Sequence, residues 1–148
     1  MAAIVIVDDE ESVRRAIANV LSDEGHRPVL AAGADEAEKE IAAALPDLVL
    51  LDYLMPEMTG TEFLRRFRGD DRLKDVPVVV VTWDESKESR HQALNSGATD
   101  VLRKPIVRVE LIVLTQNLLE ARSRRREWGE ANARTPGPSI ELVDKIEM

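Results

Sequence analysis

The sequence predicts an α/β fold: a doubly wound, five-stranded parallel sheet with helices on both faces. Two observations indicate this class. Short apolar runs recur along the chain, and because they lack the alternation of a half-exposed strand, both faces of each strand are expected to be buried. Segments with helical character separate these runs and are long enough to serve as the crossovers that parallel strands need.

The N-terminal part supplies two strand–helix units. Residues 4–7 are a β-branched apolar run, typical of a buried strand. The helix predicted over residues 13–24 has apolar residues at helical spacing and is followed by Gly25, a favourable residue at a helix C-terminus. Residues 28–32 are expected to form the second strand. Residues 35–44 are expected to be helical, because alanine and glutamate favour helix.

The central strand covers residues 48–52 and lies between Pro46 and Pro56. Its four leading residues are apolar and its last is an aspartate. A helix capped by Thr59 follows and ends near Gly69. Taken alone, an aspartate at this place is equally well explained as an ordinary turn residue ahead of a proline.

The C-terminal part completes the sheet. Residues 76–81 are predicted to form the fourth strand and residues 101–102 the fifth, with a polar helix over residues 85–95 whose thin apolar face indicates weak docking and mobility. A last helix begins near Ile106. Its inward-facing residues are expected to be Val109, Ile112, Val113, Gln116 and Leu119. A flavodoxin-like strand order, 2-1-3-4-5, is the precedent for five strands connected in this way.

The length of 148 residues suits one domain with an appendage. The domain is predicted to cover residues 1–120, and residues 121–148 are predicted to be a helix extension that runs into a linker and tail rich in proline and glycine. Arg122 and the run 124–126 are interpreted as a solvated helix end, with an anion-binding patch as the alternative.

Composition argues against several classes of function. A formal net charge of −8 argues against general affinity for nucleic acid. No apolar run approaches the roughly 20 residues of a membrane span, so no membrane contact is expected. The chain has no cysteine, which excludes disulfides and thiolate chemistry and agrees with a reducing compartment. We therefore expect a cytoplasmic protein.

Polar side chains follow four of the five strands. Asp8 and Asp9 come after the first strand, Asp52 ends the third, Thr82 follows the fourth and Lys104 the fifth. Because the carboxyl ends of parallel strands share one edge of a sheet, these side chains are expected to converge. Clustered carboxylates repel one another and favour a hard divalent cation such as Mg²⁺. A lysine and a hydroxyl aimed at the same point suit the oxygens of a phosphoryl group.

Asp52 lies at the centre of this set and is the candidate nucleophile, since a carboxylate can accept a phosphoryl group and form an acyl phosphate. A metal ion, a fixed cation and an in-line nucleophile are the parts that phosphoryl transfer needs. The alternative is that each residue is an unrelated polar group at a strand end. Compatible chemistry at four strand ends argues against that alternative.

These residues lie in motifs that resemble the receiver domain of two-component response regulators, over about residues 3–120. The motifs are Val7–Glu10, Leu51–Pro56 with Gly60, Val81–Thr82, Gly97–Asp100 and Lys104–Pro105. The resemblance implies a signalling switch that takes phosphate from a histidine kinase or a phosphotransfer protein. It implies no enzyme in the usual sense, because such a domain catalyses only its own phosphorylation and dephosphorylation.

The resemblance also implies a role for each residue of the site. Asp52 is the implied phosphorylation site. The implied Mg²⁺ ligands are Asp8, Asp9, Asp52 and the backbone carbonyl of Leu54. Thr82 and Lys104 would contact phosphoryl oxygens, with Thr82 moving toward them as the switch. The dipeptide Lys104–Pro105 resembles the family's cis-proline turn, which keeps the lysine pointed inward.

Three positions depart from the common pattern of the family. Val101 stands where many members have the aromatic residue of a conformational switch. Trp83 follows the switch threonine, where a small residue is usual, and is expected to cover part of the site or to form a binding surface. Leu54 is apolar at a position that often tunes water access. With Trp83 and Leu54 beside the site, we predict slow loss of the phosphoryl group, because attacking water is hindered.

Two other functions agree less well with the residues. A Mg²⁺-dependent phosphatase or phosphotransferase of the haloacid dehalogenase type also uses an aspartate at a strand end, but it generally has a second aspartate two residues later, where this chain has Leu54. An interaction module that works without phosphorylation would not need all five site residues.

The output of the switch is the least specified property. No helix-turn-helix is recognisable after residue 120, so direct binding of nucleic acid by this chain is not expected. The arginine-rich extension resembles the lead-in to an output domain, which favours a piece of a longer protein. The last helices are a candidate homodimer interface.

Overall fold

The computed structural model describes residues 1–55, 58–84 and 86–132, and side chains as far as residue 127. The elements in chain order are β1 (Ala3–Val7), α1 (Glu11–Asp23), β2 (Arg27–Ala31), α2 (Ala34–Ala43), β3 (Leu48–Asp52), α3 (Gly60–Arg68), the short 3-10 helix η1 (Asp71–Leu73), β4 (Val78–Thr82), α4 (Lys87–Asn95), β5 (Asp100–Arg103) and α5 (Arg108–Asn132). This alternation confirms the predicted α/β class.

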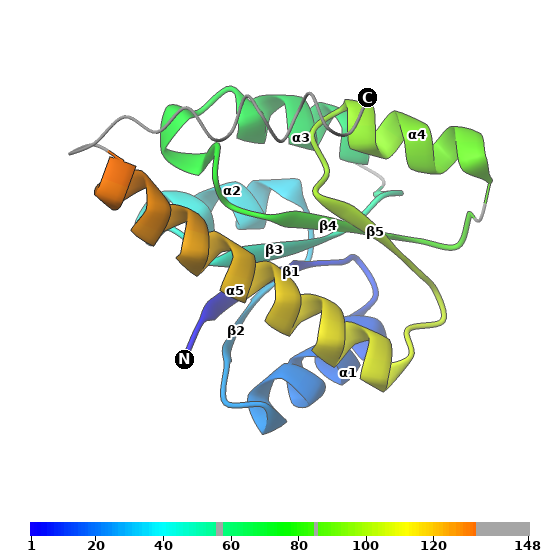
Figure 1. Cartoon of the computed structure of the whole chain (residues 1–148). Helices are drawn as coiled ribbons and strands as arrows, with labels where there is room; N and C mark the ends of the chain where they lie inside the picture. Colours follow the sequence, from blue (N-terminus) through cyan, green and yellow to red (C-terminus); the bar gives the residue numbers. More distant parts are fainter. Residues whose placement is uncertain (56–57, 85, 133–148) are drawn as a thin grey trace.

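The five strands form one parallel sheet in the order β2-β1-β3-β4-β5, as predicted (Figure 1). The chain starts near the middle of the sheet at β1, builds outward to β2, and then crosses back to β3 on the other side of β1. The connections that follow β1 and β3 therefore leave the sheet on opposite faces, and a crevice opens between the carboxyl ends of these two strands.

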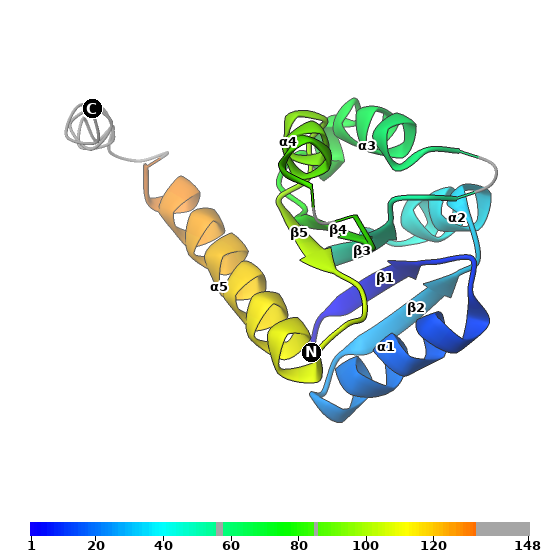
Figure 2. The same cartoon turned by 90° about the vertical axis from the view of Figure 1, so that its right-hand side faces the viewer.

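Helices cover both faces of the sheet (Figure 2). On one face Val49 and Leu51 pack with Phe63 of α3, in a core that α2 and α4 complete. On the other face Leu48 and Leu50 pack with α1 and the start of α5. Successive residues of a strand point to opposite faces, so a strand with two covered faces must be apolar throughout. This requirement explains the uninterrupted apolar runs of the sequence.

Helices α3 and α4 differ in how firmly they are attached. The predicted cap of α3 is confirmed, because the Thr59 hydroxyl accepts a hydrogen bond from Glu62 N at 3.2 Å. Helix α3 buries three large side chains, Phe63, Leu64 and Phe67. Helix α4 begins at Lys87, and the side chain that it buries is that of Ala93. The predicted first residue of this helix, residue 85, lies outside the described residues. The mobility of α4 stays a prediction.

The inward face of α5 differs in part from the one predicted, although Leu119 packs against the core as expected. Val109 and Val113 are 66% and 47% exposed, whereas Leu111 and Thr115 are buried against the sheet. Gln116, also predicted to face inward, is exposed. Aliphatic residues surround the first turns of α5, so the pattern alone leaves the buried face ambiguous. Packing against α1 and the sheet selects the stripe that contains Leu111.

Helix α5 continues past residue 120 to Asn132, in agreement with the predicted helix extension (Figure 1). Arg122 is 7% exposed, and its Nη1 lies 2.9 Å from Asp47 Oδ1. The other oxygen of Asp47 accepts a hydrogen bond from Ala3 N at 2.8 Å. The interpretation of Arg122 as a solvated residue is therefore wrong, since its partner comes from the segment just before β3. The arginines at 124–126 are exposed, as expected.

Among the described residues, none of the helices combines the length and the apolar character that crossing a membrane requires.

Candidate functional site

Strand register brings the predicted site residues to one edge of the sheet. Val7 of β1 lies opposite Leu51 of β3, so the next residues on the two strands, Asp8 and Asp52, are neighbours. Asp52 lies opposite Val81 of β4, which places Thr82 one step further along. Thr82 in turn lies opposite Arg103 of β5, which places Lys104 at the end of that strand.

The three acidic side chains form one cluster. Ligand oxygens of Asp8, Asp9 and Asp52 all lie within 4.8 Å of one another. Asp8 and Asp52 are buried, at 2% and 7% exposure, and Asp9 is exposed. Such a set offers hard oxygen ligands with one side open to solvent, which suits a cation that keeps some of its water, as Mg²⁺ does. The residues therefore fit the predicted metal.

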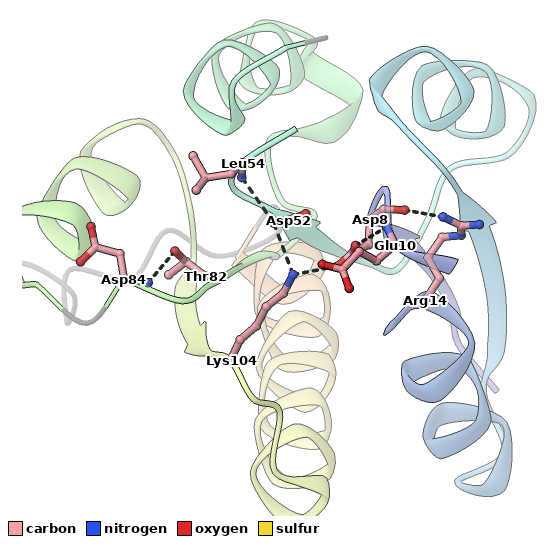
Figure 3. A network of polar contacts seen from close by, with 8 residues as sticks. All are labelled: Asp8, Glu10, Arg14, Asp52, Leu54, Thr82, Asp84 and Lys104. Atoms are coloured by element: carbon pink, nitrogen blue, oxygen red, sulfur yellow. Dashed lines mark hydrogen bonds and ion pairs between the residues drawn. The ribbon is translucent and has the colours of Figure 1, made fainter. Parts of the chain in front are cut away.

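Lys104 lies between two of these carboxylates (Figure 3). Its Nζ donates to Asp8 Oδ2 at 3.1 Å and lies 3.6 Å from Asp52 Oδ1. Burial lowers the pKa of Lys104, but the hydrogen bond to Asp8 and the charges of Asp52, Asp8 and Glu10 outweigh it, so the pKa is raised. The lysine is therefore a permanent cation at the centre of the site.

The surroundings of Asp52 shift the pKa of its carboxyl group. Burial raises its pKa, the neighbouring charge of Asp8 raises it further, and Lys104 and the Leu54 amide lower it, with a net pKa of about 6. A single lysine does not balance the negative charge gathered here. A bound divalent cation would favour the ionised carboxylate.

Thr82 ends β4, and its hydroxyl is engaged away from Asp52. Thr82 Oγ1 accepts a hydrogen bond from Asp84 N at 3.1 Å, and Figure 3 shows this contact on the side of Thr82 toward α4. Asp84 Oδ1 accepts in turn from Ser86 N at 2.8 Å, and Ser86 caps α4. The threonine is thus connected through Asp84 and Ser86 to the start of α4.

The three predicted gating residues differ in their exposure and in their surroundings. Trp83 is 61% exposed and lines an open groove of about 280 Å³ together with Pro105 and residues of α1. Lys104 lines the same groove, and the role of Trp83 as a cover of the site or as a binding surface stays a prediction. Val101 is half-buried and packs against the core beneath α3 and α4. Pro105 follows Lys104 through a cis peptide bond.

Two contacts near the site involve residues that the sequence did not single out. Arg14 of α1 donates from Nη1 to the backbone oxygen of Asp8 at 2.7 Å, which braces the end of β1. Tyr53, the residue after Asp52, is buried, and its hydroxyl lies 2.7 Å from Thr61 Oγ1. A tyrosine inside an otherwise apolar run was the available signal, because a buried hydroxyl needs a partner.

Comparison with protein families decides what kind of domain this is. The family model for the response regulator receiver domain matches residues 4–116. The chain belongs to this family. The recognition made from the motifs is therefore confirmed, and the match extends from β1 into α5 and includes the residues of the candidate site.

Named relatives support the assignment. The phosphate regulon transcriptional regulatory protein PhoB of Escherichia coli is 34% identical over 109 residues, which are 74% of this chain and 48% of that protein. The response regulator MprA of Mycolicibacterium vanbaalenii is 37% identical over 134 residues, 89% of this chain and 56% of that protein. The receiver domain thus spans about half the length of the curated relatives that it matches.

Solved structures agree with the fold. The chemotaxis protein CheY4 of Vibrio cholerae superposes with a TM-score of 0.76 at 32% identity, covering 80% of this chain and 98% of that one. NtrX of Brucella abortus superposes with a TM-score of 0.83 at 29% identity, covering 98% of this chain but 34% of that one. The flavodoxin-like arrangement predicted for the receiver domain is therefore shared with these proteins.

Proposed function

We propose that this receiver domain accepts a phosphoryl group on Asp52 from a histidine kinase or a phosphotransfer protein, with Mg²⁺ bound beside it. The observation that carries the proposal is the meeting of three carboxylates and one lysine at a single edge of the sheet. Lys104 Nζ lies 3.1 Å from Asp8 and 3.6 Å from Asp52, although Asp8 and Lys104 are 96 residues apart in the chain.

The transfer step needs an ionised Asp52. An oxygen of Asp52 attacks the phosphorus of the phosphohistidine, and the new P–O bond forms as the P–N bond breaks. The imidazole nitrogen leaves with the electron pair of that bond and takes up a proton from water. With a pKa of about 6, most Asp52 is ionised at pH 7.

The metal ligands proposed are the side chains of Asp8, Asp9 and Asp52 and the backbone carbonyl of Leu54. When bound, Mg²⁺ would neutralise charge on the transferring phosphoryl oxygens. Lys104 supplies a second, fixed positive charge, and its bond to Asp8 directs the ammonium group at the space beside Asp52. Arg14 supports this arrangement from outside by holding the backbone of Asp8.

Thr82 is the proposed switch. A hydrogen bond donated by its hydroxyl to a phosphoryl oxygen would draw the Thr82 side chain toward Asp52. The turn that contains Asp84 and Ser86 would shift with it. Helix α4 follows this turn and buries little apolar surface of its own. Phosphorylation is therefore expected to redistribute two arrangements of α4 that differ little in free energy.

The proposed partners follow from this switch. PhoB carries the name of a transcriptional regulatory protein and is about twice as long as the matched region, so we propose that this domain controls an output domain or a separate partner. Direct contact of this chain with nucleic acid is not proposed, because the net charge is −8. Val109 and Val113 are exposed apolar residues on α5, so we propose the last helices as the candidate homodimer surface. We propose a cytoplasmic location, where such kinases present their phosphohistidine.

The haloacid dehalogenase alternative lacks a necessary group. That chemistry uses a second carboxyl group two residues after the nucleophile as acid and base. Leu54 stands there, and its side chain is 71% exposed. The chain therefore offers no proton donor for the leaving group of a small phosphate ester at this position.

The proposal is tested by incubation with Mg²⁺ and acetyl phosphate, followed by intact-protein mass spectrometry. The expected product carries one phosphoryl group, located on Asp52 by peptide mapping. Asp52→Asn is the matched control and is expected to remain unmodified. Absence of the adduct on the unaltered protein, or equal addition to Asp52→Asn, would contradict the proposal.

A further inference from the structure

The backbone that follows Asp52 is held by several hydrogen bonds. Leu54 N donates to Asp52 Oδ1 at 3.3 Å, and Gly60 N donates to Tyr53 O at 3.0 Å. Leu54 and Thr59 also form an isolated antiparallel bridge. Residues 53–54 and residues 59–60 therefore lie antiparallel to each other, and we call these four residues the doubled segment, which includes the carbonyl of Leu54.

The side chain of Tyr53 packs against the same segment. It is buried, and its hydroxyl lies 2.7 Å from the hydroxyl of Thr61 in the first turn of α3. The ring lies against the backbone at Gly60, where a Cβ atom would come within 2.3 Å of Tyr53 Cδ1. Glycine is thus required at residue 60 for the ring to reach Thr61, and the ring ties the residue before Leu54 to a helix.

We propose that the hydrogen bond between Tyr53 and Thr61 is a positioning device for the metal site. It sets the direction of the Leu54 carbonyl and thereby the affinity for Mg²⁺, although neither side chain would touch the ion. This inference rests on the proposed function, because it takes the Leu54 carbonyl as a ligand of Mg²⁺. Tyr53 and Thr61 are positioning residues, and the groups that contact the reacting atoms remain those described above.

The physical reason lies in the different freedom of the ligands. Carboxylates such as Asp9 can rotate to follow an ion, but a backbone carbonyl points where its peptide plane points. Mg²⁺ demands nearly ideal octahedral geometry at short distances, whereas Ca²⁺ accepts a flexible shell at longer ones. Loosening the peptide at Leu54 is therefore expected to cost Mg²⁺ more affinity than Ca²⁺. Partners outside the ligand shell commonly affect metal affinity in this way.

The test measures Mg²⁺ and Ca²⁺ affinity by calorimetry on the full chain and on three variants, Tyr53→Phe, Thr61→Val and the double variant. Each single variant is expected to bind Mg²⁺ roughly tenfold more weakly. The double variant is expected to bind like either single one, because all three remove the same hydrogen bond. The loss for Ca²⁺ is expected to be smaller. Thr61→Ser keeps a hydroxyl and is expected to bind Mg²⁺ like the unaltered chain.

Three results would overturn the inference: unchanged Mg²⁺ affinity in Tyr53→Phe, equal losses for Mg²⁺ and Ca²⁺, or no recovery in Thr61→Ser. These results are distinct from failure of the proposed function. That failure would appear as an unaltered chain whose Mg²⁺ affinity does not depend on Asp52, measured with Asp52→Asn in the same titration.

Discussion

Asp52 is a buried carboxyl group beside two acidic residues, Asp8 and Asp9, and one basic residue, Lys104. Burial raises its pKa, Asp8 raises it further and Lys104 lowers it, and the pKa settles at about 6 instead of the ordinary 3.8. The folded protein therefore binds this proton more tightly than the unfolded chain does. In the absence of metal, the free energy of unfolding should fall as the pH rises from about 4 to about 6, and the loss should persist at pH 7.

Replacing Asp52 with asparagine removes the loss of unfolding free energy that accompanies ionisation of this buried carboxyl group. We expect Asp52→Asn to raise the free energy of unfolding at pH 7 by about 1–3 kcal/mol without Mg²⁺, and to remove the decline between pH 4 and 6. Urea unfolding at several pH values measures both effects. Glu40→Gln, on the exposed side of α2, is the control and should change stability by no more than about 0.5 kcal/mol. An Asp52→Asn variant less stable than the parent at pH 7 would refute this account.

Leu54 presents an apolar side chain at the rim of the site, 71% exposed. An amide at this position could hold the attacking water by a hydrogen bond. We expect Leu54→Asn to shorten the lifetime of the phosphorylated protein roughly fivefold, a change of about 1 kcal/mol in the barrier. The measurement is the decay of the phosphorylated mass after acetyl phosphate is removed, with Leu54→Met as the apolar control. Slower decay of the phosphorylated form in Leu54→Asn than in the parent would contradict this prediction.

Among the elements, α5 is attached to the rest of the fold by two unlike contacts. Leu111 near its start is buried in the core it shares with α1. Arg122, three turns later, is held by Asp47 at 2.9 Å. The second contact joins the extension of α5 to the amino end of the sheet, opposite the carboxyl end where Asp52 lies.

The contribution of this ion pair can be separated from that of exposed pairs on the same helix. We expect Arg122→Ala to lower the free energy of unfolding by about 1–2 kcal/mol, because the guanidinium is buried and its loss leaves Asp47 without its charged partner. Arg124, 70% exposed and 3.9 Å from Glu120, is the matched control, and Arg124→Ala should cost less than about 0.5 kcal/mol. Chemical denaturation of both variants measures how far each substitution lowers the free energy of unfolding. Equal losses would contradict the larger contribution assigned to Arg122.

The molecule as a whole carries a formal charge of −8, and part of its acidity is gathered at one edge of the sheet. Folding creates this cluster, since Asp8 and Asp52 come from different strands. A cation that binds the folded protein and not the unfolded chain must stabilise the fold. Metal binding and overall stability are therefore linked in this domain.

Mg²⁺ is expected to raise the free energy of unfolding by about 2.7 kcal/mol at a concentration 100 times its Kd. Thermal unfolding with and without Mg²⁺, at ionic strength matched with sodium chloride, measures this gain apart from general screening. Asp9→Asn is expected to lose most of the gain, because Asp9 is the exposed member of the cluster and contributes little else to the fold. A gain of the same size in Asp9→Asn would rule out the acidic cluster as the binding site.

The fold class, the strand order by precedent and the residues brought to the site could be predicted from the amino-acid sequence. Parallel strands covered on two faces must be apolar throughout, and their carboxyl ends must share an edge. The sequence therefore predicts that Asp8, Asp52, Thr82 and Lys104 lie close together. Their roles in phosphorylation and metal binding remain predictions, although the family is shown.

The buried side of α5, the last residue of that helix and the partner of Arg122 are known from the three-dimensional structure and not from the sequence pattern. These properties depend on segments distant in the chain: Arg122 and its partner Asp47 are 75 residues apart. The bond from Tyr53 to Thr61 likewise depends on the angle at which α3 leaves the doubled segment after β3. Local patterns specify periodicity and strand ends, but the partner of a side chain is set by packing between elements.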